Sequence, residues 1–339
     1  MKRIISISVI ALVLLSGCTK NRFISNERIA PISLTANFGQ PATKAIITDD
    51  NITSQIIRVQ VSKSNGTESY DVLTPSKYKL SYSGQWSLSQ TLYLSAENAK
   101  IYAYAPSPTD EAIFPQIESG QYNTLKRKLD IPASQPMANQ VDYLWCYQDK
   151  TQAVGGNFIN STYKNVTLTM EHALSQIAFV IYGENYNGNG EINSVKIKDN
   201  SGTPALKIMK SGENDLYMSV LTGGITGGET TAEISATSIG GSILTAAPVI
   251  SDIDDLKAKV NAYLLIVPTS VANKANVQFS FNIDNKDYSV SLTGSGVPIS
   301  WVAGQQYIYS VKLSGSALEL IGVTVTKWTP FHDTDLEIN

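Results

Sequence analysis

The chain has 339 residues and a formal net charge of −3, with 26 Lys and Arg against 29 Asp and Glu. Such a mildly acidic balance gives no reason to expect nucleic acid or an anionic membrane surface as a partner. Charged residues are only 16% of the chain, below the usual quarter or so, and Ser, Thr, Asn and Gly replace them, as in many extracellular β proteins.

The first predicted element is a secretory signal peptide. Lys2 and Arg3 precede an apolar run, Ile4 to Leu15, which would reach about 18 Å as a helix, too short for a roughly 30 Å hydrocarbon core. The run ends in Leu15-Ser16-Gly17-Cys18, which matches the bacterial lipobox. We therefore expect cleavage before Cys18 and a lipid on its thiol, which anchors the chain because each buried CH₂ contributes about 0.8 kcal/mol.

After a polar tether, a period-two alternation of apolar and polar residues predicts strands with one apolar face. In the first of these strands the apolar set is Ile32, Leu34, Ala36 and Phe38. The later alternating segments are residues 57–61, 78–82, 100–105, 166–170, 177–181, 277–283, 288–292 (across a turn at 284–287), 307–313 and 321–325, and the apolar run 143–147 is a further predicted strand.

Helical patterns are few. Residues 253–259 predict one or two turns of helix, and the acidic cluster Asp252, Asp254 and Asp255 is better suited to starting that helix than to binding calcium, since it lacks the spacing of a calcium loop. The glycine-rich segments 223–228 and 240–241 are predicted loops. Many short strands of this kind predict an all-β sandwich fold rather than an α/β fold.

The chain is too long for one typical core, which favours two domains. A polar, glycine-containing stretch near residue 160 is the predicted boundary. The expected organisation is a signal peptide (residues 1–17), a tether (18–30), an N-terminal domain (31–160) and a C-terminal domain (161–339).

The residue pattern gives no sign of catalysis. The two histidines, His172 and His332, have little chemistry arranged around them, and no cluster has the spacing of a zinc site or a phosphate loop. We therefore expect no enzyme activity, no cofactor and no metal, although carboxylates that only the fold brings together remain open.

Cysteine and aromatic residues leave one binding alternative. With Cys18 lipidated, Cys146 has no partner and is expected to be a small buried side chain. The 17 tyrosines and 4 tryptophans could stack on sugars. Because Trp301 and Trp328 lie in or beside clean strands, the interpretation as core residues is favoured for both.

Six stretches of the chain carry a family resemblance. They span nearly the whole sequence after the lipobox and are residues 42–45 (ATKA), 101–106 (IYAYAP), 141–145 (VDYLW), 168–177 (LTMEHALSQI), 264–268 (LLIVP) and 301–309 (WVAGQQYIY). In this order, the chain resembles the fimbrillin family, the pilins and pilus-associated lipoproteins of gut and oral Gram-negative bacteria.

The resemblance implies two tandem sandwiches of transthyretin-like type and assembly by donor-strand exchange. In the family, a protease removes the first strand after export to the outer membrane, and the groove accepts a strand from the next subunit. The matching cleavage position is Lys44, before Ala45, where the family has Arg. Removal of the first strand would strip Ile32, Leu34, Ala36 and Phe38 from a core and leave an open edge.

The C-terminal run Ile321, Val323 and Val325 is an alternating segment of similar length. It is a candidate donor strand, and equally the last resident strand of its own domain. The resemblance implies a surface fimbrial subunit with other pilin subunits as partners, a membrane anchor and a role in adhesion to a host or bacterial ligand. The alternative is a surface glycan-binding lipoprotein, which exposed coplanar aromatic rings would favour. A first strand central to its sheet would favour polymerisation.

Overall fold

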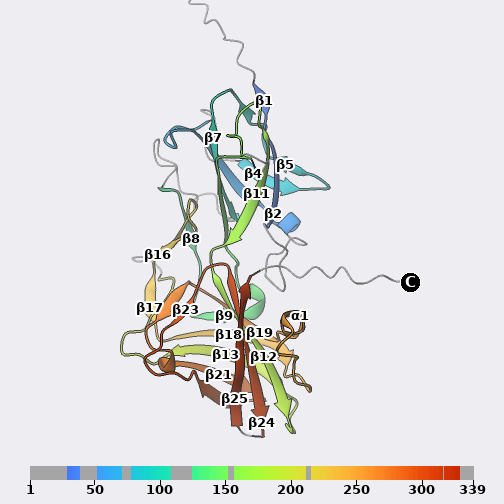
Figure 1. Cartoon of the computed structure of the whole chain (residues 1–339), viewed down its shortest axis with the longest axis vertical. Coiled ribbons are helices and arrows are strands. Elements are labelled where there is room, and N and C mark those ends of the chain that lie inside the picture. Colours follow the sequence, from blue (N-terminus) through green and yellow to red (C-terminus); the bar gives the residue numbers. More distant parts are fainter. Residues whose placement is uncertain are drawn as a thin grey trace, which may run out of the picture.

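The computed structural model describes residues 29–38, 52–70, 78–107, 124–151, 156–210, 215–315 and 317–328. In these residues the protein is nearly all β, which confirms the predicted fold class. Two β-sheet bodies are stacked along the long axis of the molecule (Figure 1). We call the body that holds the first strand the N-terminal body, and the one that holds the last strand the C-terminal body.

The N-terminal body is built on a seven-stranded sheet. Every neighbouring pair in it is antiparallel, except that the first strand runs parallel to its neighbour β11. Its order is β2 (Ser33–Phe38), β11 (Asn165–His172), β10 (Leu144–Gln148), β7 (Ala99–Ala105), β3 (Ile57–Lys63), β4 (Tyr78–Tyr82) and β5 (Trp86–Leu88).

This sheet is covered on both faces, and the side chains of β7 pack into a different core on each face. Ile101, Ala103 and Ala105 enter one core with the first strand, whereas Tyr102 and Tyr104 enter a second core on the opposite face. Successive side chains of a strand point to opposite faces, so a strand between two cores is apolar throughout. The second core is closed by a three-stranded sheet of β8 (Lys126–Leu129), β15 (Leu216–Ser219) and β16 (Ile225–Gly227).

The C-terminal body is a sandwich of two sheets. Phe179 of one sheet meets Phe279 and Phe281 of the other edge-on, with ring centroids 5.0 and 5.2 Å apart. One sheet has the order β19 (Ala262–Ile266), β12 (Ser175–Glu184), β24 (Gln305–Ser314), β25 (Ala317–Lys327); the other has β22 (Lys286–Ser291), β21 (Val277–Ile283), β13 (Glu191–Asp199), β18 (Glu233–Ser242), β9 (Ser134–Pro136).

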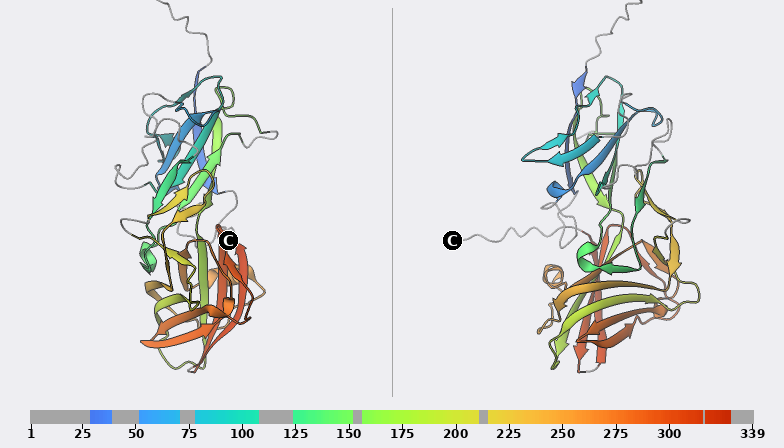
Figure 2. Two further views of the ribbon diagram at one scale, coloured as in Figure 1. Left: turned by 90° about the vertical axis from the view of Figure 1, so that its left-hand side faces the viewer. Right: turned by 180° about the vertical axis from the view of Figure 1, so that it is seen from behind.

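Smaller elements complete the described fold (Figure 2). The remaining strand pairs are β1 (Ala30–Pro31) with β6 (Tyr93–Leu94), β14 (Leu206–Ile208) with β17 (Glu229–Thr231), and β20 (Thr269–Val271) with β23 (Ile299–Trp301). The helices are α1 (Ile253–Ala258) and the short 3₁₀ turns η1 (Ile52–Ser54), η4 (Met137–Asn139) and η5 (Lys274–Asn276). Within the described ranges, no helix has the length and apolar character needed to span a bilayer.

Several local predictions are confirmed. The side chain of Asp252 caps α1 by accepting hydrogen bonds from the amides of Asp254 and Asp255. The hairpin between β21 and β22 turns at Asp284 and Asn285, which both take positive φ, as a tight two-residue hairpin requires.

The predictions of glycine loops are wrong in two places. Residues 225–227 form β16, and Gly240 and Gly241 lie inside β18. Gly240 has φ +68°, a conformation that glycine takes without steric cost, and β18 continues through it with a register shift against β13.

The expected boundary at residue 160 and the transthyretin-like detail of both domains stay predictions. Strand pairing crosses that boundary in both directions. β11 begins at Asn165 and belongs to the N-terminal sheet, whereas β9, from the first half of the chain, pairs with β18 in the C-terminal body.

Candidate functional site

The clearest candidate site is the position that the first strand occupies between β11 and β6. We call this position the seat of the first strand. Along residues 33–38, β2 pairs in parallel register with β11, from Ser33 opposite Asn165 to Phe38 opposite Met170. Ile32, Leu34 and Ala36 are buried, with 8%, 4% and 7% of their surface exposed. The predicted apolar face is therefore observed for these three residues. The backbone of Phe38 lies in the strand, and its side chain is outside the described part of the structure.

The first strand is bonded on both sides. Ahead of β2, the two residues of β1 pair with β6, and the Ile32 amide donates to the Leu92 carbonyl at 2.9 Å. β2 also lies beside β5, the opposite end of the seven-stranded order. β2 is therefore not central to its sheet, contrary to the arrangement expected to favour polymerisation. Instead, the strand closes the gap between β11 on one side and β5 and β6 on the other.

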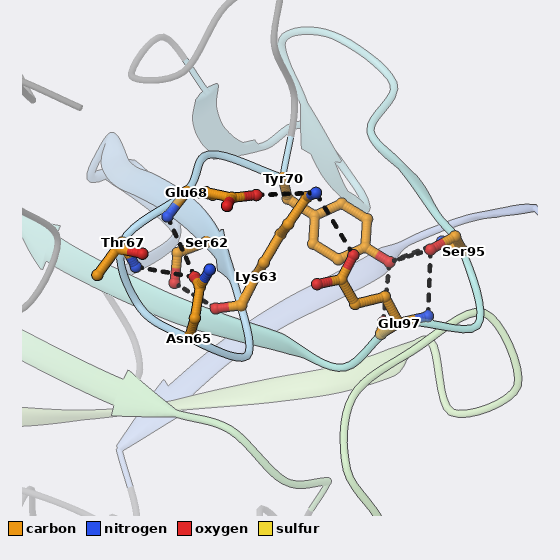
Figure 3. Close-up of polar contacts among 8 residues, drawn as sticks. All are labelled: Ser62, Lys63, Asn65, Thr67, Glu68, Tyr70, Ser95 and Glu97. Carbon is orange, nitrogen blue, oxygen red and sulfur yellow. Dashed lines mark hydrogen bonds and ion pairs between the residues drawn. The ribbon is translucent and has the colours of Figure 1, made fainter. Parts of the chain in front are cut away.

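A polar cluster supports the β6 side of this seat (Figure 3). The Tyr70 hydroxyl accepts a hydrogen bond from the Ser95 amide at 2.8 Å and donates to the Glu97 carbonyl at 2.9 Å. Lys63 lies between the carboxylates of Glu68 and Glu97 at 3.0 and 3.6 Å. The hydrogen bond that the Lys63 ammonium donates to Glu68, together with the charge of Glu97, raises the pKa of Lys63. These contacts tie the turn after β3 to the segment that follows β6.

Within the same turn, the Asn65 side chain accepts hydrogen bonds from the amides of Thr67 and Glu68, at 3.0 and 3.2 Å. Asn65 therefore stabilises this turn, as Asn side chains commonly do.

The C-terminal strand β25 belongs to the C-terminal body. It pairs with β24 from Ala317 to Lys327 and is the edge strand of its sheet. Val323 and Val325 are 52% and 53% exposed, and Ile321 is partly buried. A cavity of about 510 Å³ lies beside this strand, and its lining includes Ile321, Val323 and Val325. The structure thus places the candidate donor run as a resident strand whose apolar side chains are only half covered.

A buried aromatic and hydrogen-bonded contact joins the two bodies. Nδ1 of His172, at the end of β11, lies 2.9 and 3.1 Å from the two carboxylate oxygens of Asp142. The His172 ring stacks on the indole of Trp328, with centroids 4.1 Å apart and planes 9° from parallel. All three residues are at most 6% exposed. His172 therefore makes a buried structural contact with Asp142, and Trp328 is buried as expected.

Beside this contact is a cavity of about 730 Å³, with Trp145, Glu171, His172 and Trp328 in its lining. Its wall includes Gly223, where a Cβ atom would come within 2.2 Å of Trp145 Nε1. The glycine allows the loop before β16 to lie directly on the indole ring.

The remaining candidate residues have structural roles. Cys146 is buried and free, and burial raises the pKa of its thiol to about 12, as expected for a small core residue. Trp301 is 1% exposed, and its Nε1 donates to the Tyr309 hydroxyl at 3.1 Å. In the described part of the chain no group of three or more His, Cys, Asp or Glu side chains is placed to hold a metal ion.

Four predicted residues lie outside the described ranges: Cys18, Lys44, Ala45 and His332. The sequence pattern did not indicate Asp142 as the partner of His172. A single acid in the apolar stretch before β10 and a single histidine at the end of another strand were the available signals, because a buried charge needs a partner.

The fold and its buried first strand define a class of two-body β proteins, and the comparisons identify the family. The chain belongs to the fimbrillin-like family, whose model matches residues 43–328, which confirms the resemblance. No curated protein matches the chain.

Three similar solved structures support the fold. They are a candidate cell adhesion protein of Bacteroides uniformis (15% identity, 88% of this chain and 99% of that chain covered, TM-score 0.54), one of Bacteroides ovatus (13%, 88% and 98%, 0.57), and a fimbrial protein of Bacteroides vulgatus (11%, 88% and 99%, 0.51).

Proposed function

We propose that this protein is a structural or accessory subunit of a cell-surface pilus, assembled by donor-strand exchange, with a role in adhesion. The observation that carries the proposal is the seat of the first strand, which pairs with β11 along residues 33–38 and is attached at its start to β6 and Leu92. Membership of the fimbrillin-like family and the names of the similar structures, fimbrial and cell adhesion proteins, support the same role.

The first strand suits removal and replacement. Its departure would uncover Val166, Leu168 and Met170 of β11, which are all at most 3% exposed. It would also leave the β11 edge without a partner along six residue pairs. An open edge beside an apolar groove is the arrangement that binds an added strand, because main-chain hydrogen bonds supply affinity and the pockets supply register.

The donor in this proposal is the C-terminal strand. β25 is an edge strand, so it can leave without separating two neighbours. Its run Ile321, Val323, Val325 repeats the alternate apolar spacing of Ile32, Leu34, Ala36. The half exposure of the two valines means that insertion into a closed groove would bury apolar surface that is open in the single subunit, at about 25 cal/mol per Å².

Export and maturation complete the proposal. The lipobox at Cys18 would place the precursor on the outer membrane, and cleavage after Lys44 would release the first strand. Lys44 and Ala45 fall between the end of β2 and the start of η1. We propose no catalytic function and no cofactor. Its partners are other pilin subunits, the membrane through the lipid, and a host or bacterial surface ligand.

The glycan-binding alternative gains little from the exposed aromatic residues. Tyr82 is 42% exposed and contacts Trp86, but their rings meet at 66°. Stacking on a sugar needs a flat, accessible platform, and these two rings do not form one.

The experiment that tests assembly is size-exclusion chromatography of three forms: the chain from residue 19, the chain from Ala45, and the chain from Ala45 without residues 317–339. The first should be a monomer, the second should form polymers, and the third should not grow. A peptide of residues 29–38 added in trans should return the second form to monomer, whereas the same peptide with Leu34→Asp should not. A folded protein from Ala45 that stays monomeric at high concentration would refute the proposal.

The anchor has its own test. Cys18→Ala should abolish incorporation of labelled palmitate in the bacterium, because the thiol is the only proposed acceptor. Unchanged labelling of that variant would show that the lipid is elsewhere.

A further inference from the structure

Strand β11 contacts both segments that take part in the proposed assembly: the first strand, and Trp328 at the end of the proposed donor strand. Val166, Leu168, Met170 and His172 point to one face of it, because alternate residues of a strand share a face. The first three belong to the core that holds the first strand. His172 lies two residues beyond the last pair with the first strand, and its ring stacks on Trp328.

Trp328 anchors the end of the C-terminal strand and is more buried than the side chains of the strand itself. It directly follows Lys327, the last residue of β25, and its amide donates to the Gly304 carbonyl at 2.8 Å. It is 3% exposed, whereas Leu318 and Leu320 are only partly buried and Val323 and Val325 half exposed. Burial and stacking hold its side chain, but its buried indole Nε1 has no hydrogen-bond partner among the residues that the structure describes. A buried donor without a partner is unfavourable, so the Trp328 side chain is well packed but carries an energetic cost at its Nε1.

We propose that the Asp142–His172–Trp328 stack is a latch that keeps β25 in its resident place, and that β11 makes the latch depend on the first strand. Asp142 is a positioning residue, because its carboxylate fixes the His172 ring through Nδ1. When the first strand leaves, β11 loses one ladder of hydrogen bonds and its covered face, so the end of β11 that carries His172 loosens and Trp328 is released.

The purpose of the latch rests on the proposed function, since a released β25 matters only if that strand is donated. The physical claim that the stack limits opening of β25 does not depend on the proposed function. The latch predicts that local opening of β25 in the intact single subunit is limited by a residue outside the strand and by a histidine of the other body.

Hydrogen exchange with mass spectrometry on the chain from residue 19 tests the latch. Trp328→Ala should speed exchange of the β25 amides at least tenfold and leave β13 and β21 unchanged. Phe158→Ala is the control, because it removes an aromatic side chain that is 48% exposed, lies over Lys150 and is not part of the core that holds the first strand. Equal β25 exchange in Trp328→Ala and the unchanged protein would overturn the latch.

Two milder variants keep the test decisive if Trp328→Ala does not fold. His172→Phe retains an aromatic ring for stacking but loses the bond to Asp142, and Asp142→Asn retains the shape but loses the charge. Each should speed β25 exchange by a smaller factor than loss of the indole. Exchange as slow as in the unchanged protein in both variants would refute the role of the histidine and its partner.

The coupling through β11 has a separate readout. Leu34→Ala weakens the packing of the first strand, which is distant in sequence from β25. Leu206→Ala makes the same truncation in the core of the C-terminal body, to which β25 belongs. Leu34→Ala should speed β25 exchange more than Leu206→Ala does. If Leu34→Ala affects β2 and β11 alone, the coupling is wrong. Chromatography of the form from Ala45 decides the proposed function, so either idea can fail without the other.

Discussion

Truncation of Leu34 tests most directly whether the first strand is part of a core. Leu34 is 4% exposed and packs in the core that includes Val166 and Leu168. Leu→Ala changes at such sites cost about 2–5 kcal/mol, depending on how far the surroundings collapse. We expect about 2–3 kcal/mol here, because a site near the edge of a sheet can relax more than a central one.

The matched control is Thr35→Ala on the opposite face of the same strand. Thr35 is exposed, and its hydroxyl shares a 3.0 Å hydrogen bond with the hydroxyl of Thr167, so its loss should cost within about 1 kcal/mol. With urea m-values of about 1–3 kcal/mol/M, Leu34→Ala should lower the first unfolding midpoint by roughly 1–2 M. A shift no larger than that of Thr35→Ala would refute the assigned role of Leu34 in the core.

Three further predictions follow from local geometry. Asp252→Ala removes the cap of α1 and should lower stability by about 1 kcal/mol, measured by urea unfolding. The pKa of the Cys146 thiol is raised by burial to about 12, so thiol reagents at pH 8 should label it only after denaturation; because its unfolded pKa is about 8.5, stability should also fall as pH rises above that value. Gly223→Ala brings a Cβ against Trp145 at a φ of +68° and should cost at least about 1–2 kcal/mol and shift the tryptophan emission, whereas Gly224→Ala should do neither.

The strands were predictable because alternation reports which side chains share a face. It does not report which strands are neighbours. The run IYAYA of β7 has alternating residue sizes, and the structure sends the two sets to different cores. The pairing of β8 with β15, about 90 residues later in the chain, has no local signal either, since it depends on covering the second face of the N-terminal sheet.

The candidate site was predictable in part. The apolar spacing of Ile32, Leu34 and Ala36 correctly indicated burial of those side chains. The closure of the sheet by a strand bonded to β6 at its start and to β11 afterwards was not predictable, because it depends on how the sheet curls. The pair of Asp142 and His172 was missed for the same reason, since its members come from different strands and share no motif.

The position of the first strand bears on how assembly could work at all. A central strand has a neighbour on each side along its whole length, so its removal would divide the sheet. β2 pairs with β11 alone, while the short β1 ahead of it provides the second attachment at β6. Its loss therefore leaves the remaining strands β11, β10, β7, β3, β4 and β5 joined in one ladder. Because the remaining sheet stays connected, it can remain folded after the first strand has left. Its uncovered apolar face still favours binding of a strand from another subunit.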